Sequence, residues 1–402
     1  MQQESRIPIV LDAGPAVHQS AGLSRYTEEL IRHLSKDERL DLSLFYNSHS
    51  GHKLPYTLSE VPKQTRKLGQ LPWRLGVLLS QLVRRPIFQQ DIFPPSFQPL
   101  HQPSHPSASH QDTVAIYHAT EHLLPCLPLP TVLTVHDLIF ERYPQHHTLR
   151  NRLYLRLAMP LFVRRATQII AVSTYTKNDL VELYGTPEEK ITVIYEGVDQ
   201  RFQPASALEI ERIKARYSPG HPYLLMVGTL EPRKNHIAAI KAMLHLRNAG
   251  LPHKLLIAGG KGWLFDPIQA QVKQMELEND VIFAGFVPDD DLPALYSGAT
   301  CVLVPSLYEG FGFSVAEAMA CGTPVISSKV SSLREIGGDA AMLLDKPEDD
   351  EELAAQIRIV IEEPDVTKAL SAMGRKQVDR FRWDTTAKET ADLYQSIHNR
   401  WI

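Results

Sequence analysis

The sequence is poor in cysteine, with Cys126, Cys301 and Cys321 the three examples among 402 residues. Three cysteines so widely spaced form neither a disulfide framework nor a zinc-finger pattern, and they suit a reducing compartment. No apolar run reaches the ~18–20 residues of a membrane span. The N-terminal residues also lack the basic and then apolar layout of a signal peptide. From these absences we expect a cytosolic protein.

The sequence also lacks a strong net charge, which is −4 at pH 7. This small negative value argues against a protein coated in positive charge, so no nucleic-acid partner is expected. Ordinary proportions of apolar (43%) and charged (22%) residues exclude wholesale disorder, collagen and coiled coil. Two stretches of the first half, residues 61–90 and 142–178, nevertheless contain several cations and no acid.

Short runs rich in Val, Ile and Leu alternate with amphipathic stretches, as expected for buried parallel strands covered by crossover helices. The expected strands are Ile7–Asp12, Leu42–Tyr46, Ala115–His118, Val132–His136, Ile169–Val172, Ile191–Tyr195, Tyr223–Val227, Lys254–Ala258, Val281–Ala284, Cys301–Val304 and Pro324–Ser327. The expected helices are Ser24–Lys36, Leu149–Arg165, Thr174–Tyr184, His236–Asn248, Asp266–Glu278, Asp290–Ser297 and Phe313–Ala320. The alternation predicts an α/β protein of two doubly wound, Rossmann-like domains that face a central cleft.

The predicted N-terminal domain spans residues 1–200 and the predicted C-terminal domain residues 201–380. Residues 381–402 are expected to form a helix that packs back towards the N-terminal domain. A Pro- and His-rich insertion at about residues 51–112 interrupts the first domain, and its low-complexity part, His101–His110, predicts a mobile surface loop. The histidines of this loop fit no tight metal-ligand spacing.

One chemically suggestive motif is VGTLEPRKN, Val227 to Asn235. A strand ends at Gly228, and Arg233 and Lys234 follow at the start of a predicted helix. Backbone N–H groups at a helix N-terminus attract a phosphate, and two cations add to that attraction. A solvated basic turn is the alternative interpretation.

A second motif, PSLYEGFGFSVAEAMACGTPVISS, runs from Pro305 to Ser328. Glu309 lies in a loop with Gly310 and Gly312, whose small size lets a backbone approach a ligand closely. Glu317 follows eight residues later inside an otherwise apolar helix. A largely buried helix with a single carboxylate suggests a bound polar partner, although surface acids are the alternative.

With their spacing, these motifs resemble those of the retaining glycosyltransferases of family four, which have the GT-B fold. Downstream LLIAGG, VIFAGFV and LREIGGDAAMLLD complete the resemblance in order, and it covers essentially the whole chain. In the first half, AGLSRYTEEL and TVHDLIFERYP resemble the subset that acts in bacterial O-antigen and exopolysaccharide assembly, often mannosyltransferases. One departure is Thr229, where many members have Arg.

The resemblance implies roles for matching residues. Arg233 and Lys234 would bind the donor diphosphate, Glu309 the hydroxyls of the transferred sugar, and Glu317 those of the ribose. His136 would face the donor sugar, which makes His136, Glu309, Arg233 and Lys234 the expected catalytic residues; a satisfied core histidine is the alternative for His136. The remaining expected donor-binding residues are Gly22, Gly228, Phe286, Val287, Phe311, Gly312 and Phe313.

No metal or other cofactor is expected. Asp289, Asp290 and Asp291 have the letters of an Asp-any-Asp metal motif, but they follow Pro288 and precede a predicted helix, which favours an N-cap. In Leu71–Phe88, Trp73 and aliphatic residues mix with arginines. This mixture fits either an amphipathic helix in an anionic membrane interface or a solvated basic face over a core helix.

The expected function is retaining, metal-independent transfer of a hexose from a nucleotide sugar to a growing, lipid-linked glycan in cell-surface polysaccharide synthesis. The donor we expect is GDP-mannose, while UDP-glucose, UDP-N-acetylglucosamine and GDP-fucose remain open. A UDP-sugar-dependent transferase, a phosphorylase or epimerase of the same fold, and a non-catalytic nucleotide-sugar binder are the alternatives. The expected location is the cytoplasm, with peripheral attachment to the inner face of the cell membrane as a hypothesis.

Overall fold

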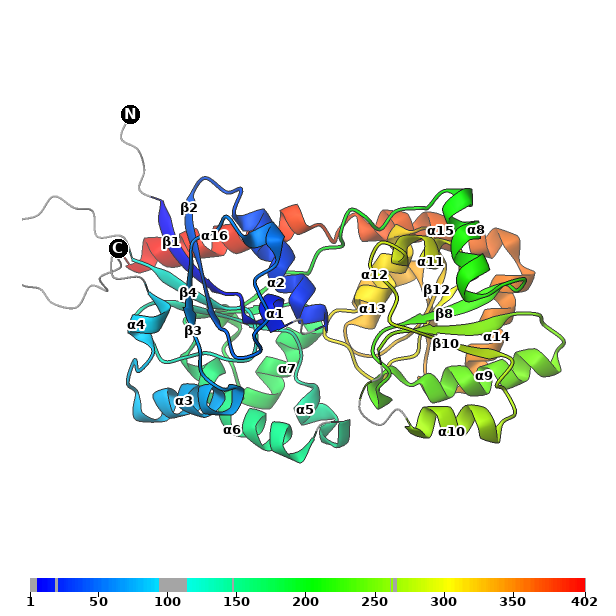
Figure 1. Cartoon of the computed structure of the whole chain (residues 1–402), viewed down its shortest axis with the longest axis horizontal. Helices are drawn as coiled ribbons and strands as arrows, with labels where there is room; N and C mark the ends of the chain where they lie inside the picture. Colours follow the sequence, from blue (N-terminus) through cyan, green and yellow to red (C-terminus); the bar gives the residue numbers. More distant parts are fainter. Residues whose placement is uncertain are drawn as a thin grey trace, which may run out of the picture. The chain divides into compact units, whose positions relative to one another are not determined.

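A computed structural model describes residues 6–18, 21–93, 114–146, 148–260, 262 and 266–401. The chain forms two compact units: unit 1 comprises Met1–Gly197 with Trp383–Ile402, and unit 2 comprises Val198–Arg382. Each unit is built on one parallel sheet (Figure 1). The segment His101–His110, for which the sequence predicts a surface loop, lies outside the described residues.

Unit 1 contains a seven-stranded sheet in the order β3-β2-β1-β4-β5-β6-β7. Its strands are β1 (Ile7–Asp12), β2 (Leu40–Asn47), β3 (Lys63–Arg66), β4 (Ile116–Ala119), β5 (Thr131–Val135), β6 (Gln168–Ala171) and β7 (Ile191–Val193). Its helices are α1 (Gly14–His18), α2 (Ala21–Leu34), α3 (Gln70–Val83), α4 (Gln89–Ile92), α5 (Ile139–Arg142), α6 (Leu149–Arg165), α7 (Thr174–Tyr184) and α16 (Trp383–Trp401). The strand order reverses between β1 and β4, the place where ligands of doubly wound sheets bind.

Unit 2 contains a six-stranded sheet in the order β10-β9-β8-β11-β12-β13. Its strands are β8 (Tyr223–Val227), β9 (Lys254–Ala258), β10 (Val281–Gly285), β11 (Val302–Val304), β12 (Val325–Ser328) and β13 (Met342–Leu344). Its helices are α8 (Ala207–Tyr217), α9 (His236–Asn248), α10 (Asp266–Gln274), α11 (Leu292–Ser297), α12 (Phe313–Ala320), α13 (Leu333–Gly337), α14 (Asp350–Glu362) and α15 (Pro364–Val378). The order again reverses at a central strand, so the predicted pair of doubly wound α/β domains is confirmed.

The central strands are apolar because helices cover both faces of each sheet. Every residue of β1 is buried, as are Leu224 and Leu225 of β8. The last helix, α16, packs on α2 and β1, and the hydroxyl of its buried Tyr394 hydrogen-bonds His118 at the end of β4. The C-terminal helix therefore completes unit 1.

The structure differs from the sequence prediction at sheet edges and in helices that the sequence did not single out, among them α8, α14 and α15. Strand β3, with the polar sequence KQTR, pairs with β2 at one edge of its sheet, and β13 is a three-residue edge strand. Strand β3 lacks the apolar run that marks a buried strand, whereas β13 has the apolar sequence MLL but is short. Helix α10 ends at Gln274, earlier than expected, and Glu276 shortly after it adopts a positive φ of 54°. No helix in the described part of the chain is long and apolar enough to span a membrane.

Candidate active site

The first predicted motif forms the loop between β8 and α9. Strand β8 ends at Val227, and Gly228 then adopts a φ of 139°, in the region that favours glycine. Arg233 and Lys234 belong to a single 3-10 turn, Pro232–Lys234, and α9 begins at His236. The helix begins at His236 as predicted, and the two cations lie in the turn just before it.

Arg233 and Lys234 converge on one buried carboxylate, that of Glu309. Lys234 Nζ donates to Glu309 Oε1 at 2.7 Å, and Arg233 Nη1 donates to Glu309 Oε2. Ser306 Oγ also donates to Oε1, at 2.8 Å. A second carboxylate, Glu231, binds the other side of the Arg233 guanidinium. The sequence-predicted cations and the first predicted glutamate thus form one cluster.

The electrostatics of this cluster keep Glu309 ionised. Burial alone would raise the pKa of Glu309, but the charges of Arg233 and Lys234 outweigh burial and lower the pKa to about 2. A carboxyl group with so low a pKa is a poor proton acceptor at neutral pH. Glu309 is therefore suited to accept hydrogen bonds and to fix the two cations, not to act as a general base.

The loop after Glu309 is held by two serines that the sequence did not single out. Ser331 Oγ accepts a hydrogen bond from the Glu309 backbone N–H at 2.9 Å, and Ser332 Oγ lies 2.9 Å from the Glu309 carbonyl oxygen. Gly312 then adopts a φ of 109°, and α12 begins at Phe313. The first backbone N–H groups of a helix lack partners within the helix, so this turn presents donors at the start of α12.

Phe311, one of the predicted donor-binding residues of this loop, is held by both its side chain and its backbone. The side chain of Phe311 is buried and contacts Phe313 and Phe381, each with a ring-centroid distance of 5.4 Å. Its carbonyl oxygen lies 2.8 Å from Ser332 Oγ. Any contact of Phe311 with a donor would therefore be made by its backbone.

The second predicted glutamate, Glu317, occupies a separate environment. It is buried in α12 and its Oε2 accepts a hydrogen bond of 2.8 Å from the hydroxyl of Tyr296 on α11. Glu309 and Glu317 thus have different partners. This separation agrees with two carboxylates that address different parts of one extended ligand.

Phe286 and Val287 follow the end of β10. Phe286 is 79% exposed, whereas Val287 is buried. An exposed aromatic ring at the carboxyl end of a strand offers a face on which a base can stack. The structure places Phe286, and not the side chain of Val287, where such a contact can form.

The aspartates Asp289, Asp290 and Asp291 were predicted to cap a helix, but the structure shows ion pairs with arginines instead. Asp291 precedes α11 but its side chain makes no capping hydrogen bond. It instead accepts from Arg212 at 2.7 Å and from Arg216 at 2.9 Å, while Asp289 lies 3.6 Å from Arg201. Across the described residues, no three His, Cys, Asp or Glu side chains are grouped to hold a metal ion.

His136 in unit 1 uses both ring nitrogens. Nε2 lies 2.9 Å from the carbonyl oxygen of Thr120, and Nδ1 lies 2.8 Å from Glu196 Oε1. Burial alone would lower the pKa of His136, but the hydrogen bond and charge of Glu196 outweigh it and raise the pKa. Since a carbonyl oxygen only accepts, Nε2 carries a proton. A side-chain contact with a donor sugar would require His136 to give up one of these partners.

Gly22 lies in the first turn of α2, not in the preceding loop where the sequence placed it. Glu196, which holds His136, was missed because it follows the short edge strand β7 and has no local motif. Asp12 and Glu121 were missed too. Asp12 ends β1 and Glu121 comes two residues after β4, and these two buried strands are neighbours in the sheet. A polar residue at the carboxyl end of a parallel strand was the signal that would have found them.

Two family matches together cover most of the chain. Residues 209–377 match the glycosyl transferases group 1, and residues 20–202 match Glycosyltransferase Family 4. The chain belongs to the family 4 glycosyltransferases. The predicted family and the predicted GT-B fold are both confirmed.

Relatives and solved structures extend this result. The O-antigen chain mannosyltransferase B of Escherichia coli is 27% identical over 392 residues, which are 97% of this chain and 100% of that protein. The O-antigen chain mannosyltransferase RfbU of Salmonella typhimurium is 30% identical over 246 residues, 61% of this chain and 65% of that protein. The structure of Anabaena Alr3699/HepE in complex with UDP and glucose matches with a TM-score of 0.72 at 20% identity, covering 98% of this chain and 100% of that one. That last likeness shows the fold alone.

Proposed function

We propose that this glycosyltransferase is a retaining, metal-independent hexosyltransferase that moves mannose from GDP-mannose to a growing, lipid-linked glycan. The observation that carries the proposal is the cluster of Arg233 and Lys234 on the buried Glu309. A departing nucleoside diphosphate gathers negative charge, and cations fixed in advance where that charge develops lower the barrier. The cluster supplies two such cations at the carboxyl end of β8.

Glu309 gives these cations their positions. Its two oxygens each bind one cation, so Arg233 and Lys234 have defined places before a donor arrives. A donor diphosphate would share the cations with Glu309, and the carboxylate would accept hydrogen bonds from hydroxyls of the transferred sugar. Because the low pKa of Glu309 makes it a poor base, the proton of the acceptor hydroxyl passes to another group in this proposal.

Metal independence is proposed from the same charges. Two side-chain cations supply the neutralisation that a divalent ion would otherwise give to the diphosphate. Two of the aspartates that resemble a metal motif are already engaged, since Asp291 binds two arginines and Asp289 lies 3.6 Å from Arg201. Those carboxylates would have to break ion pairs before they could ligate an ion.

The donor and the pathway are proposed from the relatives. Two proteins that this chain resembles are named O-antigen chain mannosyltransferases, and one of them matches along its whole length. A mannosyl donor and a role in cell-surface polysaccharide synthesis therefore suit this chain. A UDP-sugar is the second candidate, because a protein of the same fold binds UDP and glucose.

A ligand screen tests the donor. We expect GDP-mannose at 100 times its dissociation constant to stabilise the protein by about 2.7 kcal/mol. UDP-glucose and UDP-N-acetylglucosamine at equal concentrations should leave the thermal midpoint unchanged. With GDP-mannose and a mannose-accepting glycan, the new linkage should be α by NMR, because the donor is α-configured. Stabilisation by the UDP-sugars alone, or a β-linked product, would contradict the proposal.

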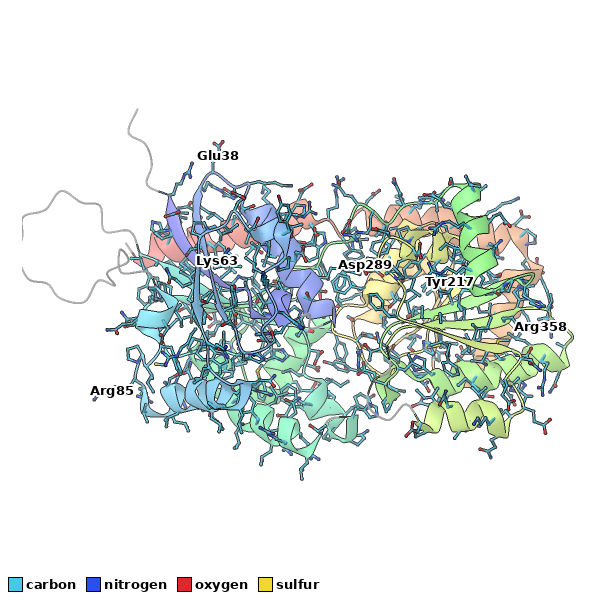
Figure 2. The ribbon with its side chains drawn as sticks, viewed as in Figure 1. Glu38, Lys63, Arg85, Tyr217, Asp289 and Arg358 are labelled. Atoms are coloured by element: carbon cyan, nitrogen blue, oxygen red, sulfur yellow. The ribbon has the colours of Figure 1, made fainter. Side chains whose placement is uncertain are left out.

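We further propose that unit 1 attaches to an anionic membrane surface through the C-terminal end of α3. Leu79, Leu82, Val83 and Ile87 are each between 48% and 59% exposed there. Arg84 and Arg85 follow directly, and Figure 2 shows Arg85 at the periphery of the molecule beside the end of α3. Exposed aliphatic side chains beside cations are typical of a surface that lies in the interface of an anionic bilayer.

Vesicle flotation tests this attachment. Changing both Arg84 and Arg85 to Gln should weaken binding to anionic vesicles about 30-fold, since each basic residue near such a surface is worth about 1 kcal/mol. Changing Arg358 and Lys368, exposed cations of unit 2, to Gln removes the same charge elsewhere and should have no effect. Equal flotation of the unchanged protein with neutral and anionic vesicles would rule the attachment out.

A further inference from the structure

A pocket of about 250 Å³ opens at the carboxyl edge of the sheet of unit 1. Four neighbouring strands, β2, β1, β4 and β5, end at this pocket and each contributes polar side chains. At or after the strand ends, these polar residues are Asn47 and His49 of β2 and its loop, Asp12 and His18 of β1 and the following helix, Glu121 and His122 after β4, and His136 after β5. Trp73, Leu23 and Leu155 provide apolar walls. A mixture of amides, carboxyl groups and imidazoles beside an aromatic face suits a ligand with many hydroxyl groups.

The two carboxyl groups of this pocket, those of Asp12 and Glu121, are not both ionised at neutral pH. Asp12 Oδ1 accepts the backbone N–H of Gly14 at 2.8 Å. Burial, together with the nearby carboxyl of Glu121, raises the pKa of Asp12 to about 8. Burial likewise raises the pKa of Glu121, although the charge of Arg74 acts against it. The pair therefore holds a proton at neutral pH, so it can both donate to and accept from the hydroxyls of a neutral sugar.

An apolar groove of about 470 Å³ lies between α3 and α6, which run side by side (Figure 1). Leu71 and Leu75 from α3 and Leu153 and Leu157 from α6 line it and are 44–60% exposed. In each helix these leucines are four residues apart, so each pair shares one face of its helix. Four large aliphatic side chains are thus left facing solvent along a hollow rather than a flat surface.

The pocket and the groove meet at the side chains that line both, those of Gln70, Arg74 and Asn151. Arg74 Nη2 donates to Asn151 Oδ1 at 2.9 Å, and its guanidinium lies 4.1 Å from the centre of the Tyr154 ring. Within the described residues no carboxylate forms an ion pair with Arg74, and no acid lines the groove. A fixed arginine without an ion-pair partner at the mouth of an apolar groove suits a phosphate.

We propose that unit 1 binds an amphiphilic acceptor along this path, with a saccharide in the pocket, a phosphate at Arg74 and a prenyl chain in the groove between α3 and α6. The order of the surfaces, polar and then cationic and then apolar, is the order of the parts of a prenyl-phosphate-linked saccharide. This inference rests on the proposed function in taking the acceptor to be lipid-linked. It goes further in assigning the residues that hold each part.

The shape of the groove between α3 and α6 favours one hydrocarbon chain, and not a bilayer surface, as its ligand. The groove is recessed between two helices, whereas the exposed side chains at the end of α3 and Ile87 lie outside it. A bilayer contacts an outer surface, while a recessed apolar hollow encloses one hydrocarbon chain and removes it from water. In this proposal the C-terminal end of α3 contacts the membrane, and the groove binds the prenyl chain of an acceptor from that membrane.

Binding of farnesyl phosphate, below its micelle-forming concentration, tests the proposal by calorimetry. The unchanged protein should bind it, and inorganic phosphate at the same concentration should not bind. Leu75→Asp and Leu153→Asp should each weaken binding about tenfold or more, because a charge replaces buried apolar contact. Leu208→Asp, at a residue of unit 2 that is 81% exposed, is the matched control and should bind normally. Arg74→Gln should weaken binding of farnesyl phosphate but not of farnesol.

The groove variants alter exposed positions, so their thermal midpoints should match the unchanged protein, and Leu75→Ala gives a milder second test. Their stabilisation by GDP-mannose should also be normal, which separates this site from the donor site. Farnesyl phosphate binding in a protein that GDP-mannose fails to stabilise would support the groove while refuting the donor. Equal binding by the unchanged protein and both Asp variants would overturn the proposal. The proposal would also be overturned if these variants bound farnesyl phosphate normally and lost only vesicle flotation or self-association.

Discussion

Lys234→Ala is expected to slow sugar transfer about 100–1000-fold, the usual cost of removing one preorganised group that stabilises developing negative charge. The ammonium group of Lys234 lies 2.7 Å from the buried Glu309 carboxylate and is itself largely buried. A charge held in such a place has little water around it, so it acts on a diphosphate more strongly than an exposed lysine would. The measurement is kcat with a saturating donor.

The matched control is Lys254→Ala. Lys254 Nζ binds Asp280 at 2.9 Å and is buried to a similar extent, but it lies at the start of β9, whereas the cluster follows the end of β8. Both variants lose a largely buried ion pair, and so both should lose some stability. The rate of transfer should fall in Lys234→Ala alone. Equal kcat values for the two variants would show that Lys234 does not contribute to the catalytic step.

The same substitution has a consequence for Glu309. One of the two cations that lower its pKa is lost, while burial, which raises the pKa, remains. The pKa of Glu309 should therefore rise. Because a lowered carboxyl pKa stabilises the folded state above the unfolded value and loses that effect as pH falls, Lys234→Ala should also unfold at a less acidic pH than the unchanged protein.

The donor half of the site could be predicted because its residues are contiguous. Arg233 and Lys234 share one loop, and Glu309 shares another with Gly312, so a local pattern contains each part. Both loops follow apolar strands whose carboxyl ends meet at the same edge of a parallel sheet. Local motifs therefore singled these residues out, and the family resemblance assigned them to one ligand.

The unpredicted parts depend on contacts between distant segments. Glu196 reaches His136 across 60 positions, and Tyr296 reaches Glu317 from a different helix. The pocket of unit 1 draws its side chains from the ends of four strands and from the helices α1, α2, α3 and α6. No local period marks such residues, although α3 itself was foreseen, since both interpretations of Leu71–Phe88 place a helix there. Such residues could be found by proposing an order of strands in the sheet and then comparing the polar residues at the ends of neighbouring strands.

Gly259→Ala should destabilise unit 2 by about 3 kcal/mol, at the upper end of the usual cost of overpacking a tight site. A Cβ at this position would lie 1.9 Å from the carbonyl oxygen of Gly228 and 2.6 Å from its carbonyl carbon. Both contacts are with backbone, so no side-chain rotation relieves them. The ends of β8 and β9 would have to separate, which breaks the 2.9 Å hydrogen bond from Gly228 N to Ala258 O.

The neighbouring glycine provides the control, because a Cβ added to Gly260 meets no described atom within 4 Å. For a domain of this size the loss in Gly259→Ala corresponds to a fall in Tm of about 6–12 °C, whereas Gly260→Ala should melt close to the unchanged protein. Gly228 also lies against Lys234, whose Cε is 3.2 Å from where a Cβ of Gly228 would be. A displaced Gly228 therefore moves Lys234, the lysine proposed to bind the donor, and stabilisation by GDP-mannose should disappear in Gly259→Ala and persist in Gly260→Ala. If both variants melt and bind alike, the close approach of the two strand ends does not position the donor loop.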